Sequence, residues 1–145
     1  MKVEIVEITA SDTHPLRLAV LRSDTPTKEV VFAEDEWPDS WHLGARVGDE
    51  LVATSSWVPR EHHGTPSVQL RGMATTRHLQ GTGVGGMLLE AGCALAAAKG
   101  YATVWARARD AALAFYIRHG FEVDGDGFVD QTTQLPHHVV IRDLS

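Results

Sequence analysis

The sequence predicts a mixed α/β fold built as a single domain over residues 1–145. Three observations carry this prediction. Apolar residues alternate with period two near the N-terminus, two strand-like runs flank a hairpin signal, and the second half shows helical apolar spacing after a glycine-rich turn. The length is that of one ordinary domain, and the 43% of hydrophobic residues is typical of a folded globular protein.

Composition narrows the function classes. The formal net charge is −6, and Lys and Arg form no basic stripe, so we expect no nucleic-acid partner. No apolar run is long enough for a membrane span, and residues 1–10 lack a signal-peptide core, so we expect no membrane and a cytoplasmic location. The single Cys93 fits a reducing compartment. Acidic residues gather at 29–39, where a solvated loop is favoured over a site for a cationic substrate.

The first expected elements are a strand and a helix. Lys2–Ile8 reads K-V-E-I-V-E-I, and this alternation predicts a strand. Ser11 or Asp12 can cap a helix that runs to about Arg22. Residues 30–32 are expected to form a short helix or coil.

Three strands are expected next. Trp41–Val47 and Leu51–Val58 are strand-like runs, and the Gly48-Asp49 pair between them is typical of a hairpin. A loop over residues 59–66 leads to a further strand at Ser67–Thr75. These runs predict an antiparallel first half of the sheet.

Helices and strands alternate in the second half. The apolar spacing predicts a helix over Gly83–Lys99, followed by a strand at Tyr101–Ala106. Asp110 can cap a short helix that ends at Gly120. The last strands are expected at 121–123 and 138–142, which gives six or seven strands in all.

A glycine-rich turn lies between the strand that ends at Thr75 and the long helix. It reads Q-G-T-G-V-G-G from Gln80 to Gly86. Unpaired amides at a helix N-terminus attract phosphate, and glycines let the backbone approach a ligand closely. The turn therefore predicts a site for a phosphate-bearing cofactor.

Two nucleotide-binding motifs fit this turn poorly. A Walker P-loop needs Lys and then Ser or Thr after its last glycine, where Met87 and Leu88 stand. The dinucleotide pattern G-x-G-x-x-G matches from Gly81 to Gly86 but also requires an acidic residue at the end of the next strand. Residues 101–108 contain none, so a nicotinamide-dependent enzyme is the weaker alternative.

Three segments between Val68 and Phe121 share another pattern. The strand L-R-G-M-A-T starts at Leu70, the turn contains Q-x-x-G-x-G from Gln80, and A-x-x-F-Y-x-x-x-G-F starts at Ala112. Together they resemble the GNAT superfamily of acyl-CoA-dependent N-acyltransferases. A subset of that superfamily also has L-R-G-M-A, W-x-x-A-R and P-H, which stand here at Leu70–Ala74, Trp105–Arg109 and Pro136–His137.

The resemblance implies a central, mostly antiparallel sheet of six or seven strands flanked by helices. It implies an enzyme that moves the acetyl group of acetyl-CoA, its cosubstrate, directly to a primary amine of a small molecule or peptide. Dimers are common in the superfamily, so a homodimer is considered on this analogy alone. Many members have Asn where Arg109 stands. The implied cofactor-binding residues are Met73, Ala74, Thr75, Gln80, Gly81, Thr82, Gly83, Val84, Gly85, Gly86 and Arg109.

The resemblance also assigns the proton transfers. The family places the tyrosine at position 116 beside the thioester sulfur, and a phenol with a pKa near 10 stays protonated at neutral pH, so Tyr116 is the candidate general acid. His137 ranks first as the base. The base assignment stays open among His137, Glu61, His62, His63, His138 and a relaying water.

The remaining reactive side chains have other expected places. Cys93 lies on an apolar helix face and is expected in the core rather than as a nucleophile. Arg71 is expected to pair with a carboxylate, either on an acidic substrate or on a residue at the edge of the core. No metal site is predicted, because no His, Cys, Asp or Glu group has metal-ligand spacing. A catalytically silent acyl-CoA-binding regulatory domain is the main functional alternative.

Overall fold

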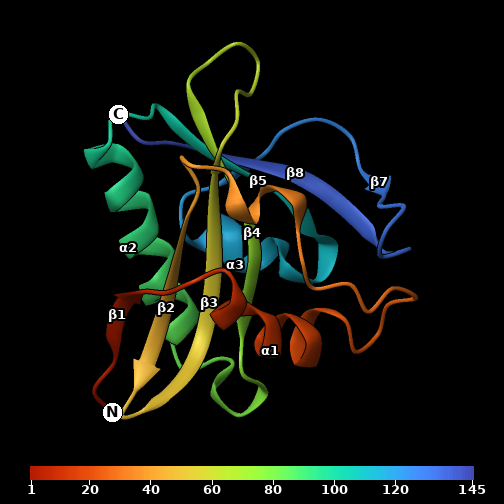
Figure 1. Cartoon of the computed structure of the whole chain (residues 1–145). Helices are drawn as coiled ribbons and strands as arrows, with labels where there is room; N and C mark the ends of the chain where they lie inside the picture. Colours follow the sequence, from red (N-terminus) through yellow and green to blue (C-terminus); the bar gives the residue numbers. More distant parts are fainter.

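An eight-stranded sheet forms the centre of the computed structural model, which describes residues 1–145 (Figure 1). The strand order is β1-β2-β3-β4-β5-β8-β6, and β7 pairs with β8 outside this path. Every pairing is antiparallel except that of β4 with β5. The strands are β1 (Glu4–Glu7), β2 (Trp41–Val47), β3 (Glu50–Pro59), β4 (Ser67–Thr75), β5 (Thr103–Arg109), β6 (Glu122–Val123), β7 (Phe128–Val129) and β8 (Pro136–Asp143).

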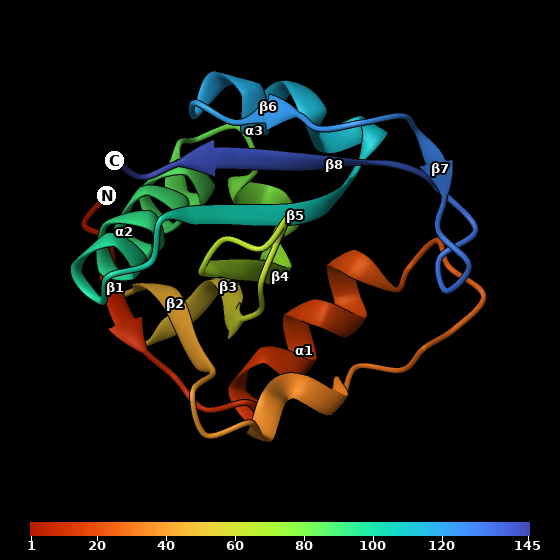
Figure 2. The same cartoon turned by 90° about the horizontal axis from the view of Figure 1, so that it is seen from above.

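Helices cover both faces of this sheet (Figure 2). A helical stretch over residues 11–21 contains α1 (His14–Leu16), with a tighter turn before it and a wider turn after it. The other helices are α2 (Val84–Ala98) and α3 (Leu113–Arg118), with single 3₁₀ turns at Ala33–Glu36, Arg77–Leu79 and Asp110–Ala112. The predicted mixed fold with a mostly antiparallel, helix-flanked sheet is confirmed. No helix is long and apolar enough to cross a membrane.

Adjacent residues of β3 show how the two layers attach. Successive side chains of a strand point to opposite faces. Ser56 therefore accepts a hydrogen bond from Arg17, which lies just after α1, while Trp57 packs under α2. A Cβ atom at Gly92 of α2 would lie 1.8 Å from the Trp57 ring, so only glycine lets the helix approach this closely. Trp57 also stacks on Trp41 in the core between α2 and the sheet.

Strand lengths differ from the expectation where distant segments pair. The strand predicted at 101–106 runs from Thr103 to Arg109, and the last strand extends over Pro136–Asp143. Each lengthens because β5 and β8 pair along seven residues, from Thr103 opposite Asp143 to Arg109 opposite His137. The unpredicted β7 is a two-residue strand whose Phe128 and Val129 pair with the start of β8.

The sheet opens between β4 and β5. Their parallel pairing is limited to Ser67–Gln69 opposite Thr103–Trp105, so the rest of each strand has no partner on that side. The β3–β4 register also shifts, with Ser56 opposite Arg71 but Thr54 opposite Ala74. Gly72 lies inside this bulge with a φ of +61°. β4 and β5 therefore splay apart beyond this short pairing, which leaves space between them.

Candidate active site

Two cavities meet where β4 and β5 separate. The glycine-side cavity has a volume of about 850 Å³ and is bounded by the end of β4, the glycine-rich turn and α3. The arginine-side cavity, of about 210 Å³, is bounded by β4, β5, β8 and the loops after α1 and β7. Met73, Ala112 and Tyr116 line both cavities, so these three residues form the wall between them.

Most of the predicted cofactor-binding residues line the glycine-side cavity. Three do not: Arg109 lines the other cavity, the Thr82 amide donates to the Leu79 carbonyl at 3.3 Å, and the Val84 side chain is buried in the core. The lining residues from the predicted set are Met73, Ala74, Thr75, Gln80, Gly81, Gly83, Gly85 and Gly86. The structure therefore brings together the β4 segment and the turn that the sequence singled out.

The turn presents free backbone amides to this cavity. Gly83 is the N-cap of α2, has a φ of +94°, and leaves the first turn of the helix without a side-chain cap. The amides of the first turn have no intrahelical acceptor and lie at the positive end of the helix dipole. A Cβ atom on Gly81 or Gly83 would meet nothing within 4 Å, so their backbone angle, rather than crowding, requires glycine. This arrangement suits an anionic group such as a pyrophosphate.

The other two glycines of the turn have a packing role that the motif does not reveal. A Cβ atom on Gly86 would lie 2.7 Å from the His119 ring of the turn after α3. One on Gly85 would lie 3.0 Å from Thr75 Oγ1 of β4. These glycines let α2 approach its neighbours closely, which holds the cavity walls in place.

Tyr116 lies on α3 at the junction of the cavities. It is only 6% exposed, and its ring makes edge-to-face contacts with Phe115 and Phe121 at centroid distances of 5.3 Å. Burial raises the pKa of the Tyr116 phenol above its usual value of 10. The phenol is therefore protonated at neutral pH, the state that a general acid requires.

His137 lies on β8 and lines the arginine-side cavity. The residue is 5% exposed, and its ring stacks on Phe128. Its Nδ1 lies 2.9 Å from the carbonyl oxygen of Leu135. Because a carbonyl can only accept, Nδ1 holds the proton, and Nε2 of the neutral ring keeps a free lone pair. His138 points elsewhere and bonds to Asp110 at 2.7 Å, as expected for the next residue of a strand.

The other candidate bases lie away from both cavities. His62 and His63 each contact Asp124 Oδ2 through Nε2, at 2.7 and 2.8 Å, and His62 stacks on Trp105. Glu61 is exposed on the same loop. The ligand atoms of His62, His63 and Asp124 lie within 4.8 Å of one another, close enough to hold a metal ion. Sequence spacing alone could not show this group, because Asp124 is distant in the chain.

Arginines dominate the smaller cavity. Arg22, Arg71, Arg107 and Arg109 line it, together with a single carboxylate, Asp130. Arg109 donates to the Leu21 carbonyl and lies 3.3 Å from Asp24. Its guanidinium thus lies on the arginine side, not on the glycine side where the resemblance implied a cofactor contact. Arg22 carries no sequence motif, and its position follows only from the tertiary fold.

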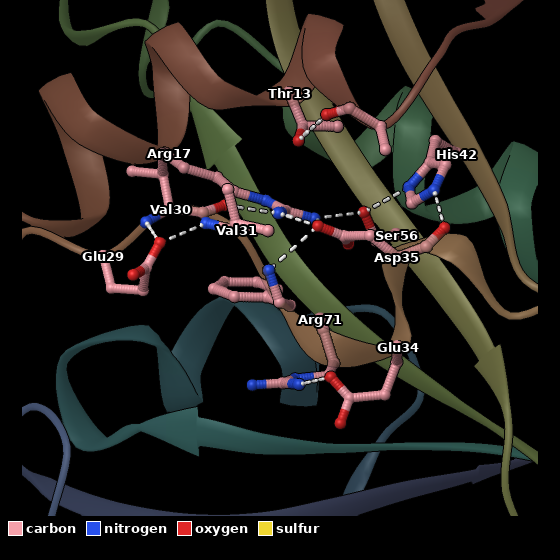
Figure 3. Close-up of polar contacts among 12 residues, drawn as sticks. Thr13, Arg17, Glu29, Val30, Val31, Glu34, Asp35, His42, Ser56 and Arg71 are labelled. Atoms are coloured by element: carbon pink, nitrogen blue, oxygen red, sulfur yellow. Dashed lines mark hydrogen bonds and ion pairs between the residues drawn. The ribbon is translucent and has the colours of Figure 1, made fainter.

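A buried network holds the wall of this cavity (Figure 3). Arg17 is fully buried and forms two hydrogen bonds of 2.8 Å with Asp35, while it also donates to Ser56 at 2.8 Å. His42 Nε2 donates to the Asp35 carbonyl at 3.1 Å, and its Nδ1 accepts from the Ser56 hydroxyl at 2.7 Å. Burial alone would raise the pKa of Asp35, but the hydrogen bonds and charge of Arg17 hold that pKa below its usual range.

The acidic segment at 29–39 is therefore not simply a solvated loop. Two of its carboxylates bind arginines: Asp35 pairs with Arg17, and Glu34 pairs with both Arg60 and Arg71. The expected carboxylate partner of Arg71 is thus a residue of this chain. These pairs anchor residues 30–36, including Phe32, against α1 and β4.

Cys93 lies in the core on α2. It is 2% exposed, and burial raises the pKa of its thiol to about 11. A thiol with this pKa is almost fully protonated at neutral pH and is a poor nucleophile. The expected core position of Cys93 is confirmed.

Known proteins are similar to this chain in sequence and in fold. Residues 6–121 match the model of the Acetyltransferase (GNAT) family. The uncharacterised N-acetyltransferase YitI of Bacillus subtilis strain 168 is 26% identical over 142 residues, which cover 96% of this chain and 94% of that protein. A putative N-acetyltransferase from Lactobacillus plantarum has a TM-score of 0.82 at 18% identity over 100% of both chains. A GNAT family acetyltransferase from Elizabethkingia anophelis, solved with acetyl-CoA bound, has a TM-score of 0.72 at 16% identity over 97% of both chains.

These matches extend along nearly the whole chain. The family model spans most of it, including the glycine-rich turn and α3, whose motifs resemble the family. The acyltransferase class predicted from the sequence is confirmed, with acetyl-CoA as the cosubstrate of the family. The chain belongs to the acetyltransferase (GNAT) family.

Proposed function

We propose that this protein transfers the acetyl group of acetyl-CoA directly to a primary amine, with the two substrates entering from the two cavities. The observation that carries the proposal is the shared wall at Tyr116, which places one buried phenol in contact with both cavities. The thioester would reach this wall from the glycine side and the amine from the arginine side.

The glycine-side cavity has the groups that the cofactor needs. The amides at Gly81 and Gly83–Gly86 suit the pyrophosphate. The backbone of Met73–Thr75 has no β5 partner and can bond to the pantetheine amides, although the Thr75 carbonyl already accepts a hydrogen bond from Gln80 Nε2 at 3.0 Å. Arg109 lines the arginine-side cavity, which favours a role for this residue near the acceptor. Its predicted contact with the cofactor stays a prediction.

The proton transfers follow from the states of two side chains. The amine nitrogen attacks the thioester carbonyl carbon, and the C–S bond breaks as the amide C–N bond forms. The departing thiolate takes the proton of the Tyr116 hydroxyl, whose raised pKa keeps it protonated until then. Nε2 of His137, unprotonated in the tautomer that the Leu135 carbonyl selects, takes the proton that the amine loses, directly or through a water.

A tyrosine-to-phenylalanine pair tests this assignment. The chain has two tyrosines, and Tyr101 lies outside both cavities, so Tyr101→Phe is a matched control. Thiol release from acetyl-CoA is measured with a panel of amines, and acetyl-CoA affinity is measured by calorimetry. We expect Tyr116→Phe to lower kcat by about 10²–10⁴-fold with little change in affinity, and Tyr101→Phe to behave as wild type. Wild-type turnover by Tyr116→Phe would remove Tyr116 from the mechanism.

The same assay separates the enzyme from the regulatory alternative. A catalytically silent domain would bind acetyl-CoA but release no thiol with any amine. The retained Tyr116 and the free Nε2 of His137 argue for the enzyme. Binding without turnover across the whole panel would instead favour the silent domain.

A further inference from the structure

The arginine-side cavity is positively charged in a negatively charged protein. The chain has a formal net charge of −6, yet this cavity is lined by four arginines and one carboxylate. Three of the four have a carboxylate partner: Arg71 pairs with Glu34, Arg107 with Asp130 and Arg109 with Asp24. Arg22 has none.

Arg22 is buried without a counter-ion. The residue is 7% exposed, and its hydrogen bonds go only to the backbone carbonyls of Glu29, at 2.8 Å, and Leu21, at 3.5 Å. Burial lowers the pKa of Arg22, the charges of Arg109, Arg71 and Arg17 lower it further, and the charge of Asp130 acts in the opposite direction without forming an ion pair with Arg22. A buried charge is costly unless an opposite charge offsets it.

The ring of Phe32 lies close to three of the arginine guanidinium groups. The guanidinium groups of Arg17, Arg71 and Arg22 lie 3.8, 4.4 and 5.7 Å from the centre of its ring. The face of an aromatic ring attracts cations, which reduces their mutual repulsion. Arg17 is already neutralised by Asp35, whereas Arg22 still lacks an anion. The positive charge of Arg22 in this cavity is therefore balanced only when an anionic group binds there.

We propose that the acetyl acceptor is a small amine that also bears an anionic oxygen group, a carboxylate or a phosphate, and that Arg22 binds this group. This inference rests on the proposed function, because it assigns the arginine-side cavity to the acceptor. The guanidinium fork matches the geometry of carboxylates and phosphates. The volume of about 210 Å³ is below that of most ligand sites and favours a small molecule such as an amino acid.

The amine of such an acceptor would react at the same cavity. The neutral amine is the nucleophile, and Nε2 of His137 at the same cavity can take the proton that it loses. The anionic group thus secures binding at Arg22, while His137 serves the amine end of the acceptor.

Matched acceptor pairs test the proposal in the wild-type enzyme. Amino acids of increasing length between amine and carboxylate are compared with their amides, and aminoalkyl phosphates with the corresponding amino alcohols. We expect kcat/KM to be at least about tenfold higher for the anionic member of a pair, the effect of one charge-assisted hydrogen bond. Preference for the carboxylate or for the phosphate identifies the source of the anion. Equal or better turnover of the neutral members would overturn the proposal.

Arg22 variants then assign the effect to one residue. We expect Arg22→Met to abolish the preference mainly through a higher KM, Arg22→Lys to restore part of it, and the control Arg46→Met, on an exposed pair with Glu4, to keep it. A preference that survives in a folded Arg22→Met variant would contradict the role of Arg22. If that variant does not fold, the substrate pairs in the wild type still decide whether the acceptor is anionic.

Failure of the proposed acetyl transfer can be distinguished experimentally from failure of the anion preference. If acetyl-CoA binds but no amine is acetylated, thermal unfolding of the CoA-saturated protein is measured with each amine pair. Stabilisation by the anionic members alone would support the anion site, and no stabilisation by any anionic amine would overturn it. Absence of acetyl-CoA binding itself would overturn the proposed function rather than the charge preference.

Discussion

At the residue scale, burial decides what Tyr116 and Cys93 can do. Both side chains lose contact with water, and burial raises the pKa of each. Tyr116 would be protonated at neutral pH even at the ordinary phenol pKa of about 10, so it keeps a proton for a departing thiolate, while the raised pKa makes it a weaker acid. For Cys93, with a pKa of about 11, burial removes the thiolate that covalent catalysis would need. Burial is therefore compatible with a proton donor at Tyr116 and works against a nucleophile at Cys93.

The sequence points to Tyr116 and His137 but not to Arg22. Tyr116 and His137 stand in short patterns, F-Y-x-x-x-G-F and P-H, that the family resemblance makes visible. Arg22 belongs to no pattern, and its burial depends on Phe32 and on the loop that follows α1. Arg22 stands out because it has no carboxylate partner, and this can be recognised only when all of its neighbours in the fold are known.

At the element scale, the start of α2 is the feature that sequence predicts best. Its glycine-rich turn follows a strand and opens a helix, and these local requirements are readable from Gln80 to Gly86. The motif does not show why each of its glycines is required. Gly83 needs a positive φ, whereas Gly86 needs room for His119. Their separate roles depend on how α2 meets α3.

Gly83→Ala tests the cofactor role of the turn, with Gly125→Ala as its matched control. Both glycines are exposed, have a φ near +90° and leave an added Cβ without a neighbour. Each substitution should therefore cost about 1–2 kcal/mol of unfolding free energy, measured by denaturant titration. Only Gly83→Ala should also weaken acetyl-CoA binding in calorimetry. Equal affinities in the two variants would show that the turn does not position the cofactor.

At the scale of the whole molecule, the predictable part of the fold is the local part. Hairpin β2–β3 and helix α2 follow from turn residues and apolar spacing within single segments. The length of β5, the presence of β7 and the Arg17–Asp35 network depend on pairs far apart in the chain. The spacing of residues along the chain does not reveal such pairs, so the sequence located the residues of the glycine-side cavity but not the charge of the arginine-side cavity.

The Arg17–Asp35 pair predicts how stability depends on pH. The pKa of Asp35 is lowered in the folded state, so the ionised carboxylate stabilises the fold above its unfolded pKa of about 3.9. This contribution is lost as the pH falls through the lower, folded pKa. Asp35→Asn leaves Arg17 buried and unpaired, which should cost about 3–5 kcal/mol at neutral pH.

The difference between wild type and Asp35→Asn should therefore narrow as the pH falls below about 4. Urea unfolding at several pH values measures it. Glu4→Gln is the control, because the Glu4–Arg46 pair is about half exposed and should contribute at most about 1 kcal/mol. A difference that stays constant down to the acid range would show that Asp35 is not ionised against Arg17.

Isotope exchange tests whether the acetyl group passes directly from acetyl-CoA to the amine at the wall between the cavities. The enzyme is incubated with acetyl-CoA and labelled free CoA, first without an acceptor and then with an amine that it acetylates. Because no thiolate is available at Cys93, we predict no label in acetyl-CoA without the amine. With the amine, CoA and acetylated product should form in equal amounts. Rapid exchange without any acceptor would reveal a covalent acetyl-enzyme and contradict the account.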